Sequence, residues 1–231
     1  MKTYLILFCL FISYQNLASQ LIATIQDPDG WTNVRKAPDG QSEIIHVIQE
    51  NELFLYNCRN GYFSHRPSEE DSSTEESEWV AVCIPKNDFC LATGAGQFPI
   101  ILDGYIHRSR LLPLEQMEEY HGDDFSFQFQ VSEFDPTNRI IDIADDKFVV
   151  SIDGRFFWGT DGEMPRTQVD AIQVKLGGKD IPVHRVFFSD IFEFRRDFSV
   201  YKNGNTFFVY QVNSDGAGGY ELVWGFDSNG L

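Results

Sequence analysis

Short runs of β-branched and aromatic residues, separated by glycine-containing turns, are the feature that most restricts the fold of this chain. The clearest run, Phe125 to Val131, alternates apolar and polar side chains at every position. Because successive side chains of a strand point to opposite faces, this run predicts a strand with one face on a core and the other in water. Similar runs recur along the chain between Asp-Gly, Asn-Gly and Gly-Gly pairs, and helical periodicity is rare. The sequence therefore predicts a mostly β protein.

Two β-rich domains are expected, because 231 residues suffice for one or two. The break is placed at residues 113–124, a polar, acidic linker with little to bury that could form one or two helical turns. Residues 1–19 have the order of a secretory signal peptide, with Lys2, an apolar run from Tyr4 to Ile12 and then small residues. That run is shorter than the roughly 20 residues of a membrane span, so we expect an exported protein with no span after signal removal.

The first domain, residues 20–112, carries a series of strand and turn signals. The expected strands are residues 21–25, 31–35, 44–48, 53–56, 79–82 and 104–107. Asp27 to Gly30 predicts a turn, because proline presets φ and glycine supplies a positive φ. The third and fourth strands are expected to pair with each other across the short link between them.

This order of signals resembles the bacterial SH3 family. Its members typically carry an Asn-Val-Arg segment (here Asn33 to Arg35), a proline turn, an alternating pair of strands and a terminal Gly-Tyr-Ile strand (here from Gly104). The resemblance implies a small N-terminal SH3-like barrel that binds a peptide or a cell-wall component. The residues expected to contact the ligand are Trp31, Asn33, Arg35, Tyr62, Trp79 and Tyr105. Trp79 and Tyr105 could instead fill the barrel core, whereas Trp31, beside a turn, is expected to be exposed.

Two insertions depart from the compact family pattern. Residues 65–78 are acidic and almost free of apolar side chains, which predicts a mobile loop or, alternatively, an acidic recognition arm. The second insertion contains Cys83 and Cys90 around a turn. In an oxidising compartment we expect a disulfide between these two, which leaves Cys58 as a semi-buried free thiol. No Cys-x-x-Cys motif and no histidine ligand spacing occur, so no metal site is expected.

The chain is strongly acidic, with 35 Asp and Glu against 18 Lys and Arg and a formal net charge of −17. Both halves share the excess, so neither offers a basic face. Nucleic acid and anionic lipid are poor candidate partners, because both are bound by neutralising phosphates with Lys and Arg. A cationic protein or peptidoglycan peptide suits the charge better, although the same charge also keeps an exported protein soluble.

Cell-wall hydrolases often accompany bacterial SH3 domains, but the sequence lacks their motifs. The residues around Cys58 depart from the Asp-Cys-Ser nucleophile motif of the associated cysteine peptidases, and no Gly-x-Ser-x-Gly occurs. His121 and His184 are the only histidines of the second half, too few for the ligands of a metal-dependent wall amidase. We therefore expect no catalytic residues and no cofactor.

The sequence of residues 125–231 predicts a second, C-terminal domain that is a β-rich sandwich or meander. The expected hairpins are residues 147–152 with 155–158 around a type I′ turn at Asp153 and Gly154, residues 169–176 with 179–183, and residues 207–212 with 220–226. A short helical stretch is expected near residues 186–192. Two glycine-rich loops, residues 159–165 and 213–219, offer oxygen ligands, but neither matches a calcium-loop pattern and both are interpreted as turns.

Two functions remain compatible with the sequence. The first is an exported, non-catalytic binding protein whose SH3-like domain engages a peptide or a cell-wall component. The second is an exported inhibitor or immunity-type protein that blocks a basic enzyme or toxin, to which electrostatic attraction would speed association. The sequence leaves open whether the periplasm, the cell surface or the medium is the destination.

Overall fold

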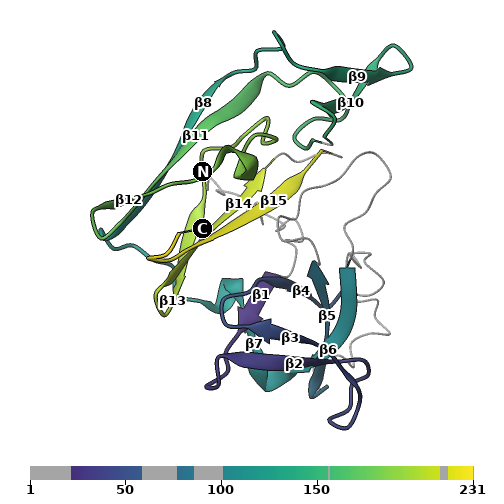
Figure 1. Ribbon diagram of the computed structural model, residues 1–231, viewed down its shortest axis with the longest axis vertical. Helices are drawn as coiled ribbons and strands as arrows, with labels where there is room; N and C mark the ends of the chain where they lie inside the picture. Colours follow the sequence, from purple (N-terminus) through teal and green to yellow (C-terminus); the bar gives the residue numbers. More distant parts are fainter. Residues whose placement is uncertain (1–21, 59–76, 86–100, 156, 214–217, 231) are drawn as a thin grey trace, which may run out of the picture.

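A computed structural model describes residues 22–58, 77–85, 101–155, 157–213 and 218–230 (Figure 1). The expectations for residues 1–19, Tyr62, Cys90 and most of the acidic insertion lie outside the described residues. Strands dominate the described chain, and its helices are three 3-10 turns of three residues each: η2 (Arg108–Arg110), η3 (Leu114–Gln116) and η4 (Arg185–Phe187). The mostly β prediction is therefore confirmed. None of the described helices is long and apolar enough to cross a membrane.

The N-terminal half is one antiparallel sheet of seven strands. They are β1 (Ile22–Ile25), β2 (Trp31–Arg35), β3 (Ile44–Gln49), β4 (Phe54–Tyr56), β5 (Trp79–Pro85), β6 (Ile101–His107) and β7 (Leu111–Pro113). Their order across the sheet is β3-β2-β6-β5-β4-β1-β7. The expected pairing of the third and fourth strands is wrong, because β3 pairs with β2 while β4 lies between β5 and β1.

This sheet curls around an aliphatic core. Val34 of β2 and Ile48 of β3 are buried in the same cluster as Ile25 of β1 and Leu111 of β7, although these strands lie near opposite edges of the sheet. Gly104 permits the close approach of β6 to β2, since a Cβ at this position would collide with the Val34 side chain. The curl brings the two edges over one core, but within the described residues no ladder joins β3 to β7, so the expected barrel is not closed.

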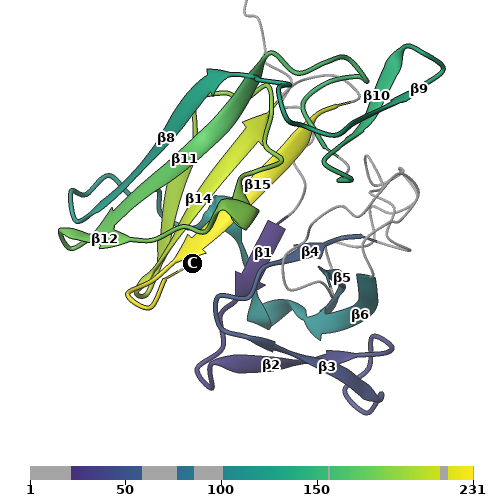
Figure 2. The same cartoon turned by 45° about the horizontal axis from the view of Figure 1, so that its top comes forward.

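The C-terminal half consists of three smaller antiparallel sheets. Their strands are β8 (Phe125–Glu133), β9 (Ile141–Ala144), β10 (Phe148–Ile152), β11 (Thr167–Leu176), β12 (Lys179–Ile181), β13 (Ser199–Asn203), β14 (Thr206–Asn213) and β15 (Tyr220–Phe226). The sheets have the orders β12-β11-β8, β13-β14-β15 and β10-β9. The first two lie face to face, which is the predicted sandwich (Figures 1 and 2).

Aromatic rings fill the sandwich. The alternation of β8 is confirmed, because Phe125 and Phe127 are buried while Ser126 and Gln128 are exposed. The Phe125 ring stacks on Phe207 of β14, with centroids 4.6 Å apart and planes 5° from parallel. The apolar faces of the two sheets therefore interdigitate through phenylalanines, as aligned sandwiches do.

One expected hairpin has a different partner. Asp153 and Gly154 both have positive φ, 55° and 71°, as a type I′ turn requires. Among the described residues after this turn, only Arg155 makes a β-bridge to β10, at Ile152, whereas Trp158 bridges Ile191. β10 pairs with β9 instead. Asp145 and Asp146 in the β9–β10 turn each have a φ of 52°. Because neither residue is a glycine, the sequence did not predict a turn there.

The expected linker is a packed connection rather than a segment with little to bury. Leu114 and Met117 are buried beside Ile22 of β1 and Phe208 of β14, and this cluster joins the two halves. The Tyr120 N–H donates to the Val200 carbonyl at 2.7 Å, which ties the same segment to β13. The two halves are thus in direct apolar contact through the residues between them.

Candidate ligand-binding site

The alternation of β2 places three of the expected site residues on one surface. Thr32 and Val34 are buried, whereas Trp31, Asn33 and Arg35 face outward from the sheet. Successive side chains of a strand point to opposite faces, so this arrangement follows from the strand itself. Trp31 is the most exposed of the three, at 43%, as the sequence predicts.

Neighbouring segments complete a pocket of about 250 Å³ around these side chains, here called the tryptophan pocket. Its lining residues are Asp27, Asp29, Trp31, Thr32, Asn33, Arg35, Gly40, Trp79, His107 and Arg110. They come from β2, the two turns that flank it, the start of β5, the end of β6 and η2. Residues up to 83 positions apart in the sequence therefore share one concave surface.

A second tryptophan forms part of this surface. Trp79 and His107 are opposite each other in the β5–β6 ladder. Their rings meet edge to face, with centroids 5.6 Å apart, a favoured geometry for aromatic pairs. The alternative that Trp79 fills the core is wrong, because Trp79 is half-buried and lies outside every apolar core cluster of the described residues.

The charged side chains of the pocket are balanced in number, with two aspartates and two arginines. Asp27 is almost fully buried, and its Oδ1 lies 3.3 Å from Nη1 of Arg110 and accepts the Asp29 N–H at 3.1 Å. Arg35 donates from Nη1 to the Ser42 carbonyl at 2.6 Å. Within the described residues the exposed Asp29 carboxylate has no ion-pair partner. The pocket therefore presents one free carboxylate and one guanidinium without a carboxylate partner.

Five of the six expected contact residues can be placed. Trp31, Asn33, Arg35 and Trp79 line the pocket together. Tyr105 does not line it, although it is opposite Arg35 in the β2–β6 ladder and shares the outer face of the sheet. It is half-buried and also lies outside the core clusters of the described residues.

Sequence reasoning found Arg35 but missed the other charged members of the pocket, Asp27, Asp29 and Arg110. Asp29 and Asp27 belong to the turn before β2, and this turn does form, since the Gly30 N–H donates to the Asp27 carbonyl at 2.9 Å. The sequence could have indicated Asp27 and Asp29, because both belong to the predicted turn just before Trp31. Arg110 lacks such a signal, because only the fold of η2 brings it to Asp27.

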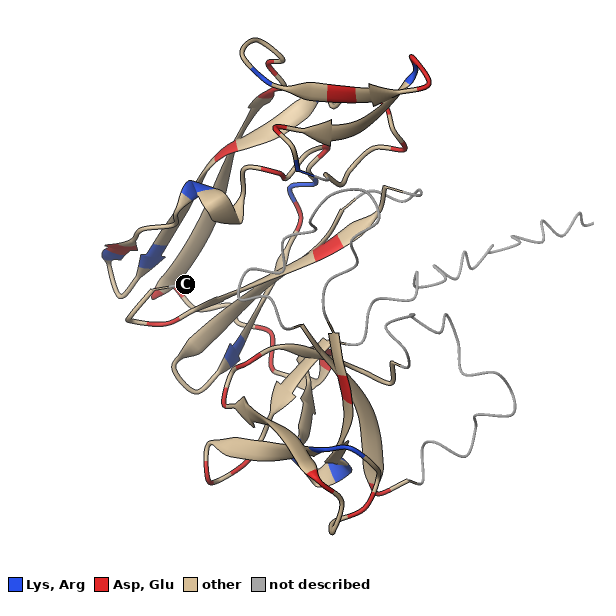
Figure 3. Cartoon of the chain, turned by 45° about the vertical axis from the view of Figure 1, so that its right-hand side comes forward, with Lys and Arg blue, Asp and Glu red and all other residues tan. Residues whose placement is uncertain are grey.

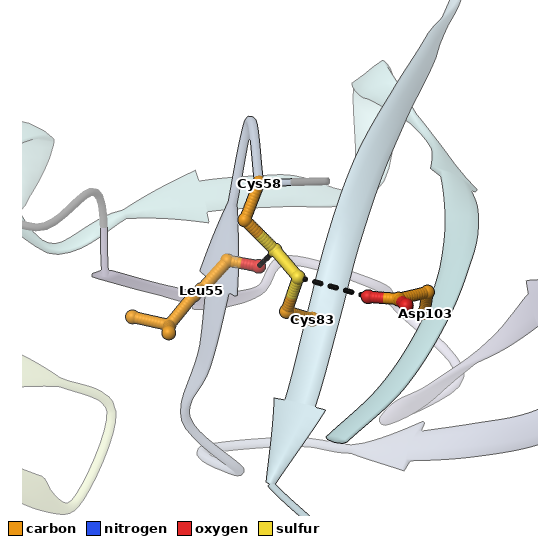
Figure 4. Close-up of a disulfide and its surroundings, with 4 residues drawn as sticks. All are labelled: Leu55, Cys58, Cys83 and Asp103. Carbon is orange, nitrogen blue, oxygen red and sulfur yellow. Dashed lines mark hydrogen bonds between the residues drawn. A yellow bond between two sulfur atoms is a disulfide. The ribbon is translucent and has the colours of Figure 1, made fainter. Parts of the chain in front are cut away.

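The disulfide of the N-terminal half differs from the expected one. Cys83 pairs with Cys58, with Cα atoms 6.1 Å apart (Figure 4), a normal disulfide separation. β4 and β5 are antiparallel neighbours with Leu55 opposite Cys83, and Asn57, at a φ of 55°, turns the chain just before Cys58. The predictions of a Cys83–Cys90 bond and of a free Cys58 thiol are thus corrected, because strand pairing brings the distant cysteine to Cys83.

Asp103 lies beside this bond, with Oδ1 3.2 Å from Sγ of Cys83 (Figure 4). Among the described residues, Cys58, Cys83 and Asp103 form the one group close enough to hold a metal ion. A metal would need the sulfurs as thiolates, whereas here they are bonded to each other. With the disulfide closed, this group is a crosslink and not a metal site.

The described parts of the two glycine-rich loops contact each other. The Gly218 N–H donates to Oδ1 of Asp161 at 2.6 Å, and the Gly159 N–H donates to the Gly218 carbonyl at 2.9 Å. A Cβ on Gly218 would collide with the backbone of Thr160. The oxygen considered as a cation ligand at Asp161 is therefore engaged in loop packing.

The tryptophan pocket thus offers aromatic rings, amide and guanidinium donors and a free carboxylate. This combination can hold a short polar chain with an apolar or cationic side group. Comparison of the sequence and structure with protein-family models, curated proteins and solved structures finds no match.

Proposed function

We propose that this chain is an exported, non-catalytic binding protein whose N-terminal half is an SH3-type module that engages a peptide or a cell-wall peptide. One observation carries the proposal: Trp31, Asn33, Arg35 and Trp79 line one pocket on the outer face of the sheet. These residues come from separate strands, β2 and β5. Their convergence supports a ligand contact, because exposed aromatic side chains grouped with a few polar groups are typical of recognition sites.

The pocket suits a peptide with an amino group. The Trp31 ring supplies a flat surface for an aliphatic or ammonium group, and the free Asp29 carboxylate can pair with the ammonium. Arg35 keeps further N–H donors beyond the one that bonds Ser42, and these can meet a peptide carbonyl or carboxylate. The proposed ligand therefore agrees with the cationic partner that the acidic composition favours.

The histidine of the pocket is engaged in a structural contact. His107 Nδ1 lies 2.8 Å from the Ser109 hydroxyl and also accepts the Ser109 backbone N–H at 3.3 Å, which caps η2. A serine nucleophile needs a base nitrogen dedicated to its hydroxyl proton and a third group that orients the base. Sharing of Nδ1 between the two groups of Ser109 supports a capping role for His107 and a binding role for the pocket.

Export is proposed from two independent features. Residues 1–19 have the composition of a secretory signal. The Cys58–Cys83 disulfide is of a kind that persists in oxidising compartments such as the periplasm, the cell surface or the medium. Contact with cell-wall peptides takes place in these compartments.

Retention on insoluble peptidoglycan tests the proposal. We expect the wild type to sediment with the peptidoglycan and Trp31→Ala to lose affinity by about tenfold or more, as for an interface aromatic anchor. Trp158→Ala is the matched control, because Trp158 is about equally exposed (40% against 43%) and lies in the other half. Absence of retention, or an equal loss in both variants, would refute a ligand site at the tryptophan pocket.

A second function, inhibition of a basic enzyme or toxin, is favoured by the β9–β10 hairpin. Ile140, just before β9, and Ile143 and Phe148 of the projecting hairpin are 67%, 55% and 41% exposed (Figure 1). Asp145, Asp146 and Lys147 connect its two strands. Apolar side chains beside carboxylates suit a partner with a basic, partly apolar surface. If the protein fails to sediment with peptidoglycan but inhibits one basic wall-degrading enzyme, and Phe148→Ala abolishes that inhibition, this second function is supported instead.

A further inference from the structure

The C-terminal half contains a larger pocket that is separate from the tryptophan pocket. It has a volume of about 520 Å³ and lies between the turn that follows β10 and the segment that contains η4. Pockets for small molecules commonly measure about 300–1,000 Å³. Its apolar wall includes Ile152, Phe157 and Phe192, which are 3%, 6% and 1% exposed and belong to one core cluster.

The charge of this pocket is opposite to that of the chain. Three arginines, Arg139, Arg155 and Arg185, line it together with two aspartates, Asp153 and Asp190. The whole chain has 18 basic and 35 acidic residues, and segments with acidic residues, coloured red, occur in both halves (Figure 3). This pocket, here called the arginine pocket, is therefore a local excess of positive charge in an acidic protein.

The carboxylate of Asp153 already has an ion-pair partner and a hydrogen-bond donor. Asp153 Oδ2 lies 2.6 Å from Nε of Arg139, and Oδ1 accepts the Ile140 N–H at 2.9 Å. Both carboxylate oxygens of Asp153 thus face the Arg139 side of the pocket. Asp153 therefore neutralises Arg139 and does not neutralise Arg155 or Arg185, whose positive charges also line the pocket.

Arg155 is positioned and still has donors to offer. Its Nη1 donates to the Ser189 hydroxyl at 2.9 Å, which fixes the guanidinium in the pocket. A guanidinium carries five N–H donors, so others remain for a ligand. Arg185 is exposed at the start of η4, and within the described residues its side chain has no ion-pair partner. Two guanidinium groups with remaining donors therefore line the same pocket.

The second aspartate competes for Arg155. Burial raises the pKa of the Asp190 carboxyl, and the nearby Arg155 offsets part of that rise. Desolvation makes the charged form of Asp190 costly, so its negative charge is poorly stabilised beside Arg155. Asp190 is therefore a like charge beside Arg155 that a bound anion would have to overcome.

We propose that the arginine pocket binds a small organic anion, a carboxylate or phosphate monoester attached to a flat apolar group. The anionic group lies between Arg155 and Arg185, because planar guanidinium groups match the oxygens of carboxylates and phosphates. The apolar group packs against half-buried Val186 and the parts of Ile152 and Phe157 that line the pocket. This site is independent of the proposed peptide site, because the two pockets share no lining residue.

Titration calorimetry of the full chain at fixed ionic strength tests this site. The probes are benzoate and phenyl phosphate, with inorganic phosphate as the anion that lacks an apolar group and benzylamine as the cationic control. We expect at least one anionic probe to bind with an affinity that depends on Arg185, whereas any benzylamine bound at the tryptophan pocket should be insensitive to Arg185→Gln. Preference for benzoate would assign a carboxylate and preference for phenyl phosphate a phosphate monoester. Failure of both anions to bind would overturn the proposal, as would equal affinity for inorganic phosphate and phenyl phosphate, because the apolar wall would then have no role.

Charge variants test whether the binding depends on Arg185. Arg185→Gln is expected to weaken binding by about tenfold or more, as loss of a charge-assisted hydrogen bond does, and its exposure makes loss of folding a poor explanation. Arg196→Gln removes an exposed arginine that does not line the pocket, so its affinity should match the wild type. Equal affinities of the Arg185→Gln variant and the wild type would overturn the proposed geometry.

A variant with the opposite effect separates binding from general damage. Asp190→Asn removes the carboxylate that competes for Arg155 and keeps the size of the side chain. We expect it to tighten binding by about fivefold, because a nearby like charge is lost. A purely structural role of Asp190 would not increase affinity, so unchanged or weaker binding in a folded Asp190→Asn variant would argue against an anion at this position.

Discussion

The tryptophan pocket lies on the outer face of a single curled sheet, whereas the arginine pocket lies beside a sandwich of separate sheets. The first balances two arginines against two aspartates, and the second has an excess of arginine. Their difference shows that a net charge of −17 describes the long-range field of the protein and not the chemistry of each site. Net charge affects solubility and the rate of encounter with partners, whereas the ligand preference of a pocket depends on the few side chains that line it.

The two halves are also stabilised in different ways. The N-terminal half combines a core of mostly aliphatic side chains with the Cys58–Cys83 bond. The C-terminal half has no disulfide among its described residues and relies on stacked and edge-to-face phenylalanines. The cluster of Ile22, Leu114, Met117 and Phe208 joins them. Removal of each support in turn therefore tests how far the halves are independent.

The largest effect is expected at the contact between the halves. Phe208 is fully buried in the joining cluster, and Phe208→Ala should lower the free energy of unfolding by about 3–5 kcal/mol through cavity formation. Calorimetry should then resolve two transitions, one for each half, because their shared core is weakened. Phe148→Ala, at a ring that is 41% exposed, should stay within about 0.5 kcal/mol of the wild type. One unbroken transition at the wild-type temperature in Phe208→Ala would contradict a shared core.

The next effect concerns the crosslink of the N-terminal half. Cys58→Ala should destabilise the protein by about 2–4 kcal/mol, because the bond restricts the unfolded chain across a separation of 25 residues. Denaturant unfolding followed by tryptophan fluorescence measures this loss.

Peptide mapping of the oxidised protein gives the matching control. Cys90→Ala should preserve the bond between Cys58 and Cys83. A Cys83–Cys90 peptide in the wild type would instead restore the pairing expected from the sequence and would contradict the structure.

The smallest effect concerns an ion pair of the C-terminal half. Burial alone would raise the pKa of Glu193, but the backbone N–H groups of Arg166 and Thr167 and the Arg166 guanidinium hold it below its ordinary value. A carboxyl with a lowered folded pKa stabilises the protein above its unfolded pKa of about 4.3 and loses that contribution as the pH falls through the folded value. Glu193→Gln should therefore cost about 1–2 kcal/mol at neutral pH and less in acid.

Thermal unfolding between neutral and acidic pH measures this dependence. The exposed Glu133 supplies the control, since Glu133→Gln removes a carboxylate at the end of β8. Its unfolding temperature should follow the wild type at every pH. A Glu193→Gln deficit that stays constant down to pH values near 3 would show that lost packing, and not the ionised carboxylate, explains the effect.

Local sequence patterns predicted which segments form strands better than they predicted which strands pair with each other. The alternation of β8 and the glycine turn between β11 and β12 were sufficient to predict those strands, because both signals act within a few residues. The partner of β10 was missed, since β9 and the Asp153 turn both adjoin it and the sequence does not show which pairing is stronger. The order of strands in a sheet depends on competition between segments that are distant in the sequence. Local periodicity contains no information about that competition.

The same distinction applies to the sites. Trp31, Asn33 and Arg35 could be predicted together because one strand presents them on one face. Tyr62 lies outside the described residues. The Cys58–Cys83 bond was missed because it follows from the position of β4 beside β5. Arg155 and Arg185 lie 30 positions apart without a shared motif, and only the packing of η4 near the β10 turn brings them into one pocket.

The position of β1 beside β7 has a mechanical consequence. The two strands are antiparallel, with Ala23 opposite Pro113 and Ile25 opposite Leu111, so the chain enters and leaves the N-terminal half at the same end of one strand pair. Tension applied at these two points would break the hydrogen bonds one after another, as a zipper opens, instead of loading them together. The half should therefore yield at low force, and the Cys58–Cys83 bond would keep the segment between those cysteines from adding to the extension.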